Sequence, residues 1–558
     1  MEKDSFISKI SESVKSGFKR LKSFVKNNTF EAVGLLLAFI TFVISIVFFC
    51  FLLKIAFIPT LYVVIIFISL IMISVICGQL QEWKVSGIIA KALCVILSVG
   101  MIIGCNYINT TIKTIDKVSG VRKQTSYMNV YVMNGNVANG IADTNHFSYG
   151  YLSGIDNENN EKVFEKINGI EYKKIEFNNV NELANALKNG DVQAIILNRV
   201  YLGLITSLDG LSNFDKEIKS IFDIKVETEV NIDDEEPTLP PLMSATPVPT
   251  GTSEPTPTHD PGVPTGSPTP TFSPTPTPTP YTGLAYTFGD LVVPKENYLY
   301  GNDNVFTCYI SGIDTFGTPD VVSRSDVNIL VTVNLNTHQI MMMNTPRDYY
   351  IPLSGANMRD KLTHAGCYGV SNSMRTLGSL YGINIDYYAK INFTGFIKVV
   401  DALGGIDIEV AKDFVSRDGY KYSQGLQHLD GTYALHYARE RNAFAGGDNQ
   451  RGKNQMQVIT AIINKLTSTD ALLHFNELFE SISQCVVTNM SYDRIAELVR
   501  YQVETMSSWN ITSHAVSGTN GWDLCYALGA ANDVVIPNED TVREARKIFR
   551  NVYNGLNP

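Results

Sequence analysis

The sequence is poor in cysteine, and its cysteines are scattered. Only 8 cysteines occur in 558 residues, and none of them forms a CxxC pair. Four fall in apolar runs near the N-terminus, where a thiol behaves as a small apolar group. His364, His428 and His436 also lack the spacing of metal ligands. A zinc site of paired ligands is therefore not expected, and the other four cysteines leave disulfide pairing open.

The sequence also lacks an excess of basic residues. Its 45 lysines and arginines against 55 aspartates and glutamates give a formal net charge of −10. A general nucleic-acid binder carries the opposite balance, so no nucleic-acid partner is expected. The N-terminus is the local exception, because basic residues precede the first apolar run: Lys3, Lys9, Lys15, Lys19, Arg20, Lys22 and Lys26.

Three long apolar runs follow, at about 31–53, 57–77 and 86–108. Each has about the 20 residues that a helix needs to cross a bilayer. The first run is too long for a removable signal peptide and has no small-residue cleavage site. We predict a basic cytoplasmic segment at 1–30 and three transmembrane helices within 31–108. Three crossings would place the rest of the chain outside the cell. The alternative, buried core helices, would require three such apolar runs packed in succession at the N-terminus.

Residues 115–232 are predicted to form a small extracellular α/β domain. YMNVYVM alternates as a strand does, VNELANALKNG has the pattern of an amphipathic helix that ends in glycine, and VQAIILN is typical of a buried strand. This order of elements resembles one lobe of an extracellular solute-binding protein, but no ligand motif accompanies it. A spacer or docking domain is an equal alternative.

Proline and threonine dominate residues 237–282, in repeats such as PTPTP and SPTPT. This composition cannot bury a core and favours extended polyproline II. At ~3.1 Å per residue the segment would span roughly 140 Å. Its hydroxyl side chains also permit O-glycosylation. A linker of this reach between a membrane and a domain fits a thick, porous layer such as a cell wall.

Residues 283–558 are long enough for one substantial domain. Three strands are predicted in succession, in VFTCYISGID, DVNILVTVNL and QIMMMNTPRDYY. If they pair antiparallel, Asp314, Asp326, Arg347 and Asp348 gather at one edge of the sheet. Two carboxylates meeting there repel each other unless a cation lies between them. Oxygen ligands that face phosphates favour magnesium.

The segment from Thr432 to Gln457 concentrates arginine. Arg439 and Arg441 follow a short helix, and Arg451 and Gln455 share one face of the next helix because they are four residues apart. Guanidinium groups that converge repel each other unless an anion holds them, and their donor fork suits phosphate oxygens. A solvated charged surface is the plainer alternative. With few carboxylates nearby, we predict a phosphate site.

Strands and helices alternate through the remainder of this domain. Helices are predicted at 371–381 and 394–403 and strands at 387–393 and 406–410, followed by helices at 449–466, 471–483, 491–506 and 539–551. The fold class is therefore α/β, with helices covering a central sheet.

Five blocks together resemble the LytR–CpsA–Psr family. They are SGID with RSDVNIL, NTPRDYY, KLTHAGCYGV, YYAKINFTGFIKVVDALGGIDIEV, and LDGTYALHYARERN with DNQRGKNQMQVI. The resemblance implies an α/β/α-type domain with a central mixed sheet. It also implies a membrane-bound phosphotransferase that moves a glycopolymer, such as teichoic acid or capsule, from a polyprenyl pyrophosphate carrier to peptidoglycan. A Gram-positive-type cell envelope follows from these partners.

The resemblance also implies roles for individual residues. Asp314 and Asp326 would hold Mg²⁺, or Mn²⁺ in its place. The pyrophosphate would be clamped by Arg347, Arg439, Arg441 and Arg451, and substrate would also contact Lys361, Gln455 and Asn392. An attacking hydroxyl needs a base, for which Asp348 and Asp448 are the candidates. Each of these two aspartates equally fits a plainer role, as an arginine partner or a helix cap.

The sequence departs from the family pattern around the expected pocket. No basic residue follows Asp314 closely, because Thr315, Phe316 and Gly317 stand there. Thr363 replaces a usual asparagine, which puts the lip of the pocket in doubt. Two alternatives to transfer remain: hydrolysis of the lipid pyrophosphate by the same residues, and a non-catalytic regulator that binds lipid or wall.

Overall fold

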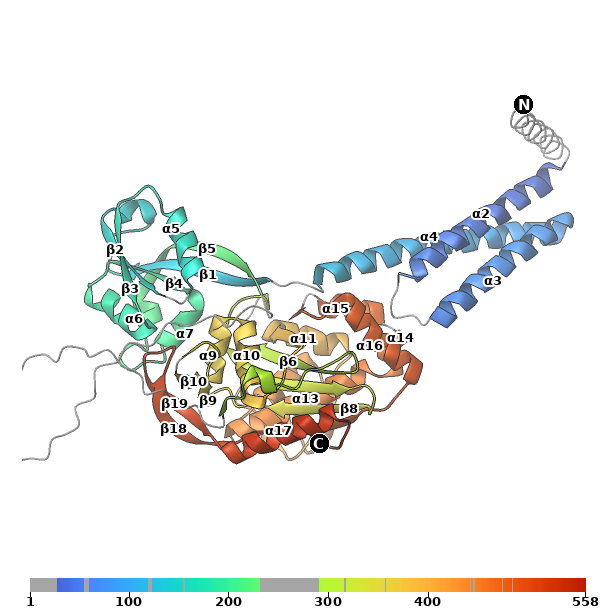
Figure 1. Cartoon of the computed structure of the whole chain (residues 1–558). Helices are drawn as coiled ribbons and strands as arrows, with labels where there is room; N and C mark the ends of the chain where they lie inside the picture. Colours follow the sequence, from blue (N-terminus) through green and yellow to red (C-terminus); the bar gives the residue numbers. More distant parts are fainter. Residues whose placement is uncertain are drawn as a thin grey trace, which may run out of the picture. The chain divides into compact units, whose positions relative to one another are not determined.

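Figure 1 shows the chain as a computed structural model. It describes residues 28–54, 60–118, 123–153, 156–230, 291–315, 318–356, 358–441, 443–444, 447–473, 475–483 and 485–558. Most of the basic N-terminal segment and the whole Pro/Thr-rich segment lie outside these residues, so both stay predictions. The chain divides into two compact units, one of residues 1–121, 463–484 and 488–508, the other of residues 122–462, 485–487 and 509–558.

The first unit contains three long helices: α2 (Thr29–Leu52), α3 (Thr60–Gln79) and α4 (Lys84–Val118), with the short η1 (Leu80–Glu82) before α4. Over Thr29–Leu52, Thr60–Glu82 and Lys84–Asn109 they are long and apolar enough to cross a membrane. Small polar side chains join α2 to α4, since the hydroxyls of Thr41 and Ser98 lie 3.0 Å apart. Such pairs are typical of helices that associate in lipid. The same unit holds α14 (Thr469–Leu473), α15 (Phe475–Ser483) and α16 (Tyr492–Thr505).

The second unit begins with a domain of residues 123–230, here called the middle domain. Its sheet has the order β3-β2-β4-β1-β5. The strands are β1 (Lys123–Met133), β2 (Phe147–Leu152), β3 (Tyr172–Phe177), β4 (Ala194–Asn198) and β5 (Ile218–Glu229), and the helices are η2 (Ile141–Thr144), α5 (Asn157–Lys166), α6 (Val180–Asn189), η3 (Arg199–Tyr201), α7 (Leu202–Ile205) and α8 (Phe214–Glu217). The predicted helix and both predicted strands are confirmed. Helix α6 begins where the Asn179 side chain accepts from the Glu182 amide, and its leucines are buried.

The C-terminal domain is built on a six-stranded sheet of order β16-β11-β6-β7-β8-β17. Its strands are β6 (Val305–Ile313), β7 (Ser325–Asn334), β8 (Gln339–Asn344), β11 (Tyr387–Asn392), β16 (Val486–Thr488) and β17 (Asn510–Ala515). The predicted antiparallel pairing of the first three is confirmed. The sheet is mixed, because β11 and β17 lie parallel to their neighbours β6 and β8.

The register of these strands fixes where the candidate site lies. Ile313 at the end of β6 pairs with Ser325 at the start of β7. Asn344 at the end of β8 pairs with Ile329. The segments that follow β6, precede β7 and follow β8 therefore meet at one edge of the sheet, as the sequence predicts.

Two groups of helices complete the mixed α/β domain. Helices α10 (Val370–Tyr381) and α17 (Glu539–Tyr553) share a buried core with Tyr309, Leu330 and Met341 of the sheet. A second core joins α11 (Phe393–Ala402), α12 (Gly431–Arg439) and α13 (Gly447–Leu466) to the strand pair β12 (Ile406–Val410) and β15 (Gly425–Leu429).

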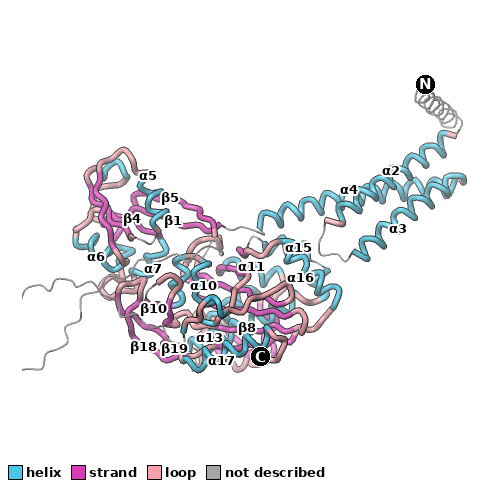
Figure 2. The backbone as a smooth tube through the Cα atoms, viewed as in Figure 1, coloured by secondary structure: helices cyan, strands magenta, loops and turns pink. Residues whose placement is uncertain are grey.

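Several short strands lie outside the predicted pattern. They are β9 (Tyr350–Pro352) with β10 (Arg359–Lys361), β13 (Phe414–Val415) with β14 (Lys421–Tyr422), and β18 (Gly518–Cys525) with β19 (Ala530–Pro537); short helices η5 (Lys295–Asn297), α9 (Leu362–Ala365) and η6 (Gly366–Tyr368) lie between. Figure 2 shows β18 and β19 side by side as a hairpin. Its residues alternate weakly between apolar and polar, so the usual strand signal is absent.

Candidate functional site

A cavity of about 390 Å³ opens at this edge of the sheet, and we call it the arginine cavity. Its lining consists of Asp314, Asp326, Val327, Arg347, Phe393, Ser416, Arg417, Asp418, His436, Arg439, Glu440, Arg441, Arg451 and Gln455. Both predicted metal aspartates, all four predicted arginines and the predicted glutamine are among these residues. The structure thus brings together groups that lie up to 141 positions apart, from 314 to 455.

Asp326 and Arg347 form the ion pair at the sheet edge. Arg347 Nη1 lies 3.1 Å from Asp326 Oδ1, and both side chains are about four-fifths buried, with 22% and 18% exposed. Thr363 Oγ1 donates to the same carboxylate oxygen at 3.2 Å. In this pair the charge of one guanidinium is balanced by the charge of one carboxylate. Asp314, at the end of β6, is exposed.

The carboxylates of the cavity have the donor type that magnesium prefers. In the described part of the chain, no three His, Cys, Asp or Glu side chains are close enough to form a metal site by themselves. Magnesium commonly takes only one or two protein carboxylates and completes its shell with phosphate oxygens and water. Asp314 and Asp326 fit that pattern, in which the protein supplies two ligands and the substrate supplies others. A metal site made of protein ligands alone does not fit the described residues.

Helix α12 brings two of the arginines to the cavity. It is capped by Asp430, whose side chain accepts from the Tyr433 amide at 2.8 Å. The helix ends at Arg439, and Glu440 is extended, with φ −71° and ψ 129°. Because extended residues alternate in direction, Arg439 and Arg441 reach the same cavity, as predicted. The Arg439 guanidinium also lies 4.4 Å from the centre of the Phe393 ring, a cation–π contact that limits its motion.

Glu440, between these arginines, is a buried anchor. Only 3% of the residue is exposed. Its Oε2 accepts from the Arg417 amide at 2.8 Å, and its Oε1 accepts from the Ala443 amide at 2.9 Å. Backbone donors to a carboxylate make strong hydrogen bonds. Glu440 thereby ties the β13–β14 turn to the arginine segment, and this tie adds Arg417 to the cavity.

Helix α13 supplies Arg451 and Gln455. A Cβ on Gly452 would lie 2.3 Å from Asn344 Nδ2, so glycine is what lets this helix approach the end of β8. Asn454 Nδ2 donates to the Tyr437 carbonyl at 3.1 Å, and Tyr437 OH donates to Gln457 Oε1 at 2.8 Å. These contacts fix α13 against α12, so the arginines of both helices face one space.

Seven lining residues lie outside the site predicted from the sequence: Val327, Phe393, Ser416, Arg417, Asp418, His436 and Glu440. His436 Nδ1 lies 2.8 Å from Asp418 Oδ2, and its ring stacks on Tyr420 with 3.9 Å between centroids. The sequence gives His436 no metal-ligand spacing and no other role, and its stacking on Tyr420 indicates packing. Local patterns do not predict Arg417 and Asp418 in the site, because contacts with Glu440 and His436, distant in the sequence, bring their turn to the arginines.

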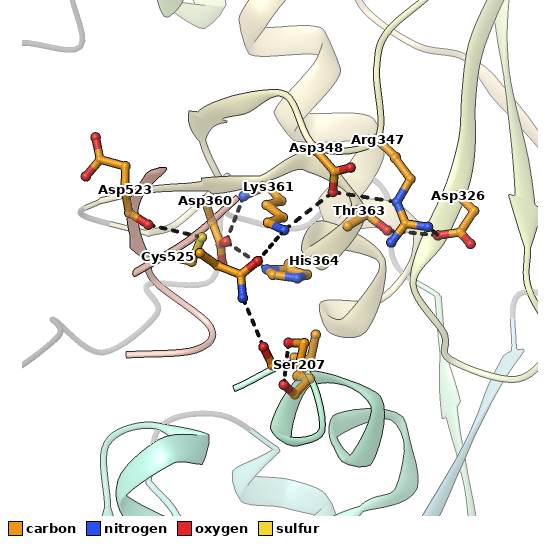
Figure 3. Close-up of polar contacts among 12 residues, drawn as sticks. Ser207, Asp326, Arg347, Asp348, Asp360, Lys361, Thr363, His364, Asp523 and Cys525 are labelled. Carbon is orange, nitrogen blue, oxygen red and sulfur yellow. Dashed lines mark hydrogen bonds and ion pairs between the residues drawn. The ribbon is translucent and has the colours of Figure 1, made fainter. Parts of the chain in front are cut away.

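Among the described side chains, three other predicted site residues are not part of the cavity lining: Lys361, Asp348 and Asn392. Lys361 Nζ lies 3.6 Å from Asp348 Oδ1, and the same oxygen lies 3.6 Å from Arg347 Nε (Figure 3). Asn392 is buried and accepts from the Gly395 amide at 2.8 Å, which makes it the N-cap of α11. The side chain of Asp448 lies outside the described residues.

Arginine outnumbers carboxylate around the cavity. Five arginines and four carboxylates are among the lining residues. Of these carboxylates, Asp326 is held by Arg347 and Glu440 by backbone amides. The lining therefore carries an excess of one positive charge, which favours an oxyanion, and the fork of each guanidinium matches phosphate oxygens.

Comparison with known proteins shows which family this chain resembles. The LytR_cpsA_psr family model matches residues 293–546. The polyisoprenyl-teichoic acid–peptidoglycan teichoic acid transferase TagU of Enterococcus faecalis is 34% identical over 206 residues, which are 37% of this chain and 68% of that protein. TagU of Bacillus licheniformis is 32% identical over 218 residues, 39% of this chain and 70% of that protein. The crystal structure of B. subtilis TagV shares 26% identity and covers 46% of this chain and 100% of its own, with a TM-score of 0.40.

Proposed function

This chain belongs to the LytR–CpsA–Psr family, and we propose that it transfers a glycopolymer from a polyprenyl pyrophosphate carrier to peptidoglycan through a phosphodiester. The predicted family is thereby confirmed, and the transferase names of the relatives agree with the predicted enzyme class. The observation that carries the proposal is the arginine cavity, where five arginines and four carboxylates from distant segments surround one space.

Phosphoryl transfer requires positioning and charge stabilisation more than covalent work by the protein. In the proposed step a hydroxyl of peptidoglycan attacks the phosphorus that carries the glycan. The bond between this phosphorus and the bridging oxygen breaks, and polyprenyl phosphate leaves with that oxygen. Arg439, Arg441 and Arg451 would hold the non-bridging oxygens, where negative charge develops. Arg347 would contact them from the sheet edge.

The proton of the attacking hydroxyl needs an acceptor. Asp348 lies between two cations, 3.6 Å from a nitrogen of Arg347 and of Lys361, which favours its role as their partner. Asp448 stays a candidate base. His436 is a further group in the cavity that can accept a proton, because a carboxylate lies beside its Nδ1.

Asp314 and Asp326 are the residues that would hold a magnesium or manganese ion. When bound, such an ion would neutralise charge on the pyrophosphate oxygens. Since Asp326 already pairs with Arg347, the same carboxylate would orient the guanidinium that contacts substrate. Lys361 does not line the cavity. It would act on the lipid phosphate indirectly, by holding Asp348, which contacts Arg347.

We further propose a multi-pass membrane protein with a cytoplasmic N-terminus. The three apolar helices support the anchor, and the basic N-terminal residues support this orientation. The C-terminal domain would then lie outside the cell, where peptidoglycan is the acceptor.

The test uses the full chain in detergent micelles with a polyprenyl-pyrophosphate-linked glycan, magnesium and peptidoglycan. Release of polyprenyl phosphate and attachment of glycan are measured together. Transfer predicts both products and a rate that depends on acceptor. Release without attachment would favour hydrolysis of the carrier. Binding of donor with no product from any of several glycans would favour the non-catalytic regulator.

A further inference from the structure

The middle domain and the β18–β19 hairpin share a buried core. Tyr201 and Leu204 of the middle domain belong to one apolar cluster with Cys367, Cys525 and Leu528 of the C-terminal domain. Gly529, in the hairpin turn, has φ +63°, and a Cβ there would lie 2.3 Å from Asn179 Cγ. This close approach and the shared core fix the hairpin against the middle domain.

A chain of polar contacts runs from this interface to the arginine cavity (Figure 3). Asn532 Nδ2 donates to the carbonyl of Ser207, in the middle domain, at 3.3 Å. Lys361 Nζ donates to Asn532 Oδ1 at 2.8 Å. Lys361 in turn faces Asp348, which faces Arg347, at 3.6 Å in each case. The last contact joins Arg347 to Asp326 at 3.1 Å.

The hairpin that carries Asn532 is also fixed to strands β9 and β10 of the C-terminal domain. Asp360 is fully buried, and its Oδ2 accepts from the Ala527 amide at 2.7 Å. Its other oxygen lies 2.7 Å from His364 Nδ1. Tyr350 OH donates to the Leu524 carbonyl at 2.8 Å. Asn532 therefore projects from a rigid support, and its amide is oriented by Ser207.

A second contact from the middle domain reaches the loop between the two predicted metal aspartates. The Thr125 amide donates to the Asp320 carbonyl at 3.0 Å, and the Val322 amide donates to the Thr125 carbonyl at 2.8 Å. Thr125 Oγ1 also donates to Asp320 Oδ2 at 2.5 Å. The middle domain thus contacts the surroundings of the cavity at two separate places.

We propose that Asn532 is a positioning residue for the pyrophosphate site. Lysine has a flexible four-carbon stem, so its ammonium stays in one place only if its partners hold it. Asn532 holds Lys361 on the side opposite Asp348, and the Ser207 carbonyl holds the Asn532 amide. Lys361 then keeps Asp348 directed at Arg347. This inference rests on the proposed function and adds a role for the middle domain in substrate binding.

The experiment measures binding of inorganic pyrophosphate, with magnesium present, to the full chain by calorimetry. Asn532→Leu keeps the branch at Cγ and removes both hydrogen bonds, and its dissociation constant for pyrophosphate is expected to rise about tenfold. Asn532→Asp keeps the acceptor for Lys361 but loses the donor to Ser207, so a smaller rise of about threefold is expected. Asn520→Leu, an exposed position on the same hairpin, is the matched control and should bind as wild type does.

Thermal unfolding of every variant shows whether the fold is retained. Equal binding by Asn532→Leu and wild type would overturn the proposal. An equal loss in Asn532→Asp and Asn532→Leu would also overturn it, because the acceptor for Lys361 is present in only one of them. Because binding needs no turnover, a wild type that binds pyrophosphate but attaches no glycan would contradict the proposed transfer and leave the positioning result intact.

Discussion

Arg347 Nη1 lies 3.1 Å from Asp326 Oδ1 and joins the segment after β8 to the start of β7. Arg347 also lines the arginine cavity, so this contact fixes the direction of a guanidinium that would meet substrate. The pair is mostly buried, so solvent and salt screen it less than they screen an exposed ion pair.

Arg347→Lys should therefore keep the charge but lose the rigid fork. We expect kcat for glycan transfer to fall about 100-fold, because a lysine cannot bond Asp326 and two phosphate oxygens in one plane. The initial rate at saturating donor measures this effect. Arg550→Lys, an exposed position on α17, is the control. A loss of similar size in both variants would contradict a specific role for the fork.

Asp314→Asn should weaken the activation of transfer by magnesium but should change the stability of the fold little. Asp314 is exposed at the end of β6, so the melting temperature should change little. We expect the magnesium concentration for half-maximal transfer to rise about tenfold or more, because a neutral amide is a weaker ligand than a carboxylate. Chelation should abolish transfer by the wild type, and Mg²⁺ or Mn²⁺ should restore it. Transfer that survives chelation would contradict the proposed metal role.

Glu440→Gln should disturb the arginine cavity by loosening the β13–β14 turn. The carboxylate accepts from two backbone amides, and a glutamine side chain has one oxygen for these two donors. We expect KM for the lipid-linked donor to rise about tenfold, since the turn with Arg417 would lose its anchor. Glu409→Gln, an exposed position on β12, provides the comparison. An unchanged KM in Glu440→Gln would show that the turn does not depend on this anchor.

Lys390 gives a pH-dependent test of the fold. It is buried in β11 and donates to the Val321 carbonyl. Burial lowers the pKa of Lys390 from 10.5 to about 8, and Asp320 opposes this shift. Between these values the unfolded chain binds more protons than the folded one, so this group makes stability rise with pH. Below about pH 8 both states are charged, and the cost of burying the charge is present in full.

We therefore expect the melting temperature of wild type, relative to Lys390→Met, to rise by roughly 2–5 °C between pH 7.5 and 9.5. Differential scanning fluorimetry at constant ionic strength measures this difference. Lys398→Met in α11 is a suitable reference substitution, since it removes a lysine from the same region. A difference between wild type and Lys390→Met that does not vary with pH would contradict a deprotonation near pH 8.

Much of the site could be predicted because its residues follow regular elements. Asp314, Asp326 and Arg347 lie next to strands that are neighbours in sequence and pair antiparallel. Short connections make that pairing the simplest one, so the edge that collects their side chains follows from the sequence. Arg451 and Gln455 share a helix face by spacing alone.

The rest of the site depends on contacts between segments far apart in the sequence. Arg417 reaches the cavity because Glu440, 23 positions later, bonds its amide. Asn532 reaches Lys361 from 171 positions away, on a hairpin whose polar strands give little signal. Asn392, which the family resemblance assigns to substrate, uses its Oδ1 as the N-cap of α11, and the substrate contact stays a prediction. Local patterns predict elements, and long-range packing decides which side chains meet.

The most direct test of phosphodiester transfer follows the phosphorus atom. A donor is labelled at the phosphate that carries the glycan and is incubated with the full chain, magnesium and peptidoglycan. The account predicts that label and glycan reach the wall in equal amounts, with one unlabelled polyprenyl phosphate released for each, and that Arg347→Ala and Asp314→Ala abolish both. Label recovered in soluble glycan phosphate, or retained in the lipid while glycan reaches the wall, would contradict it.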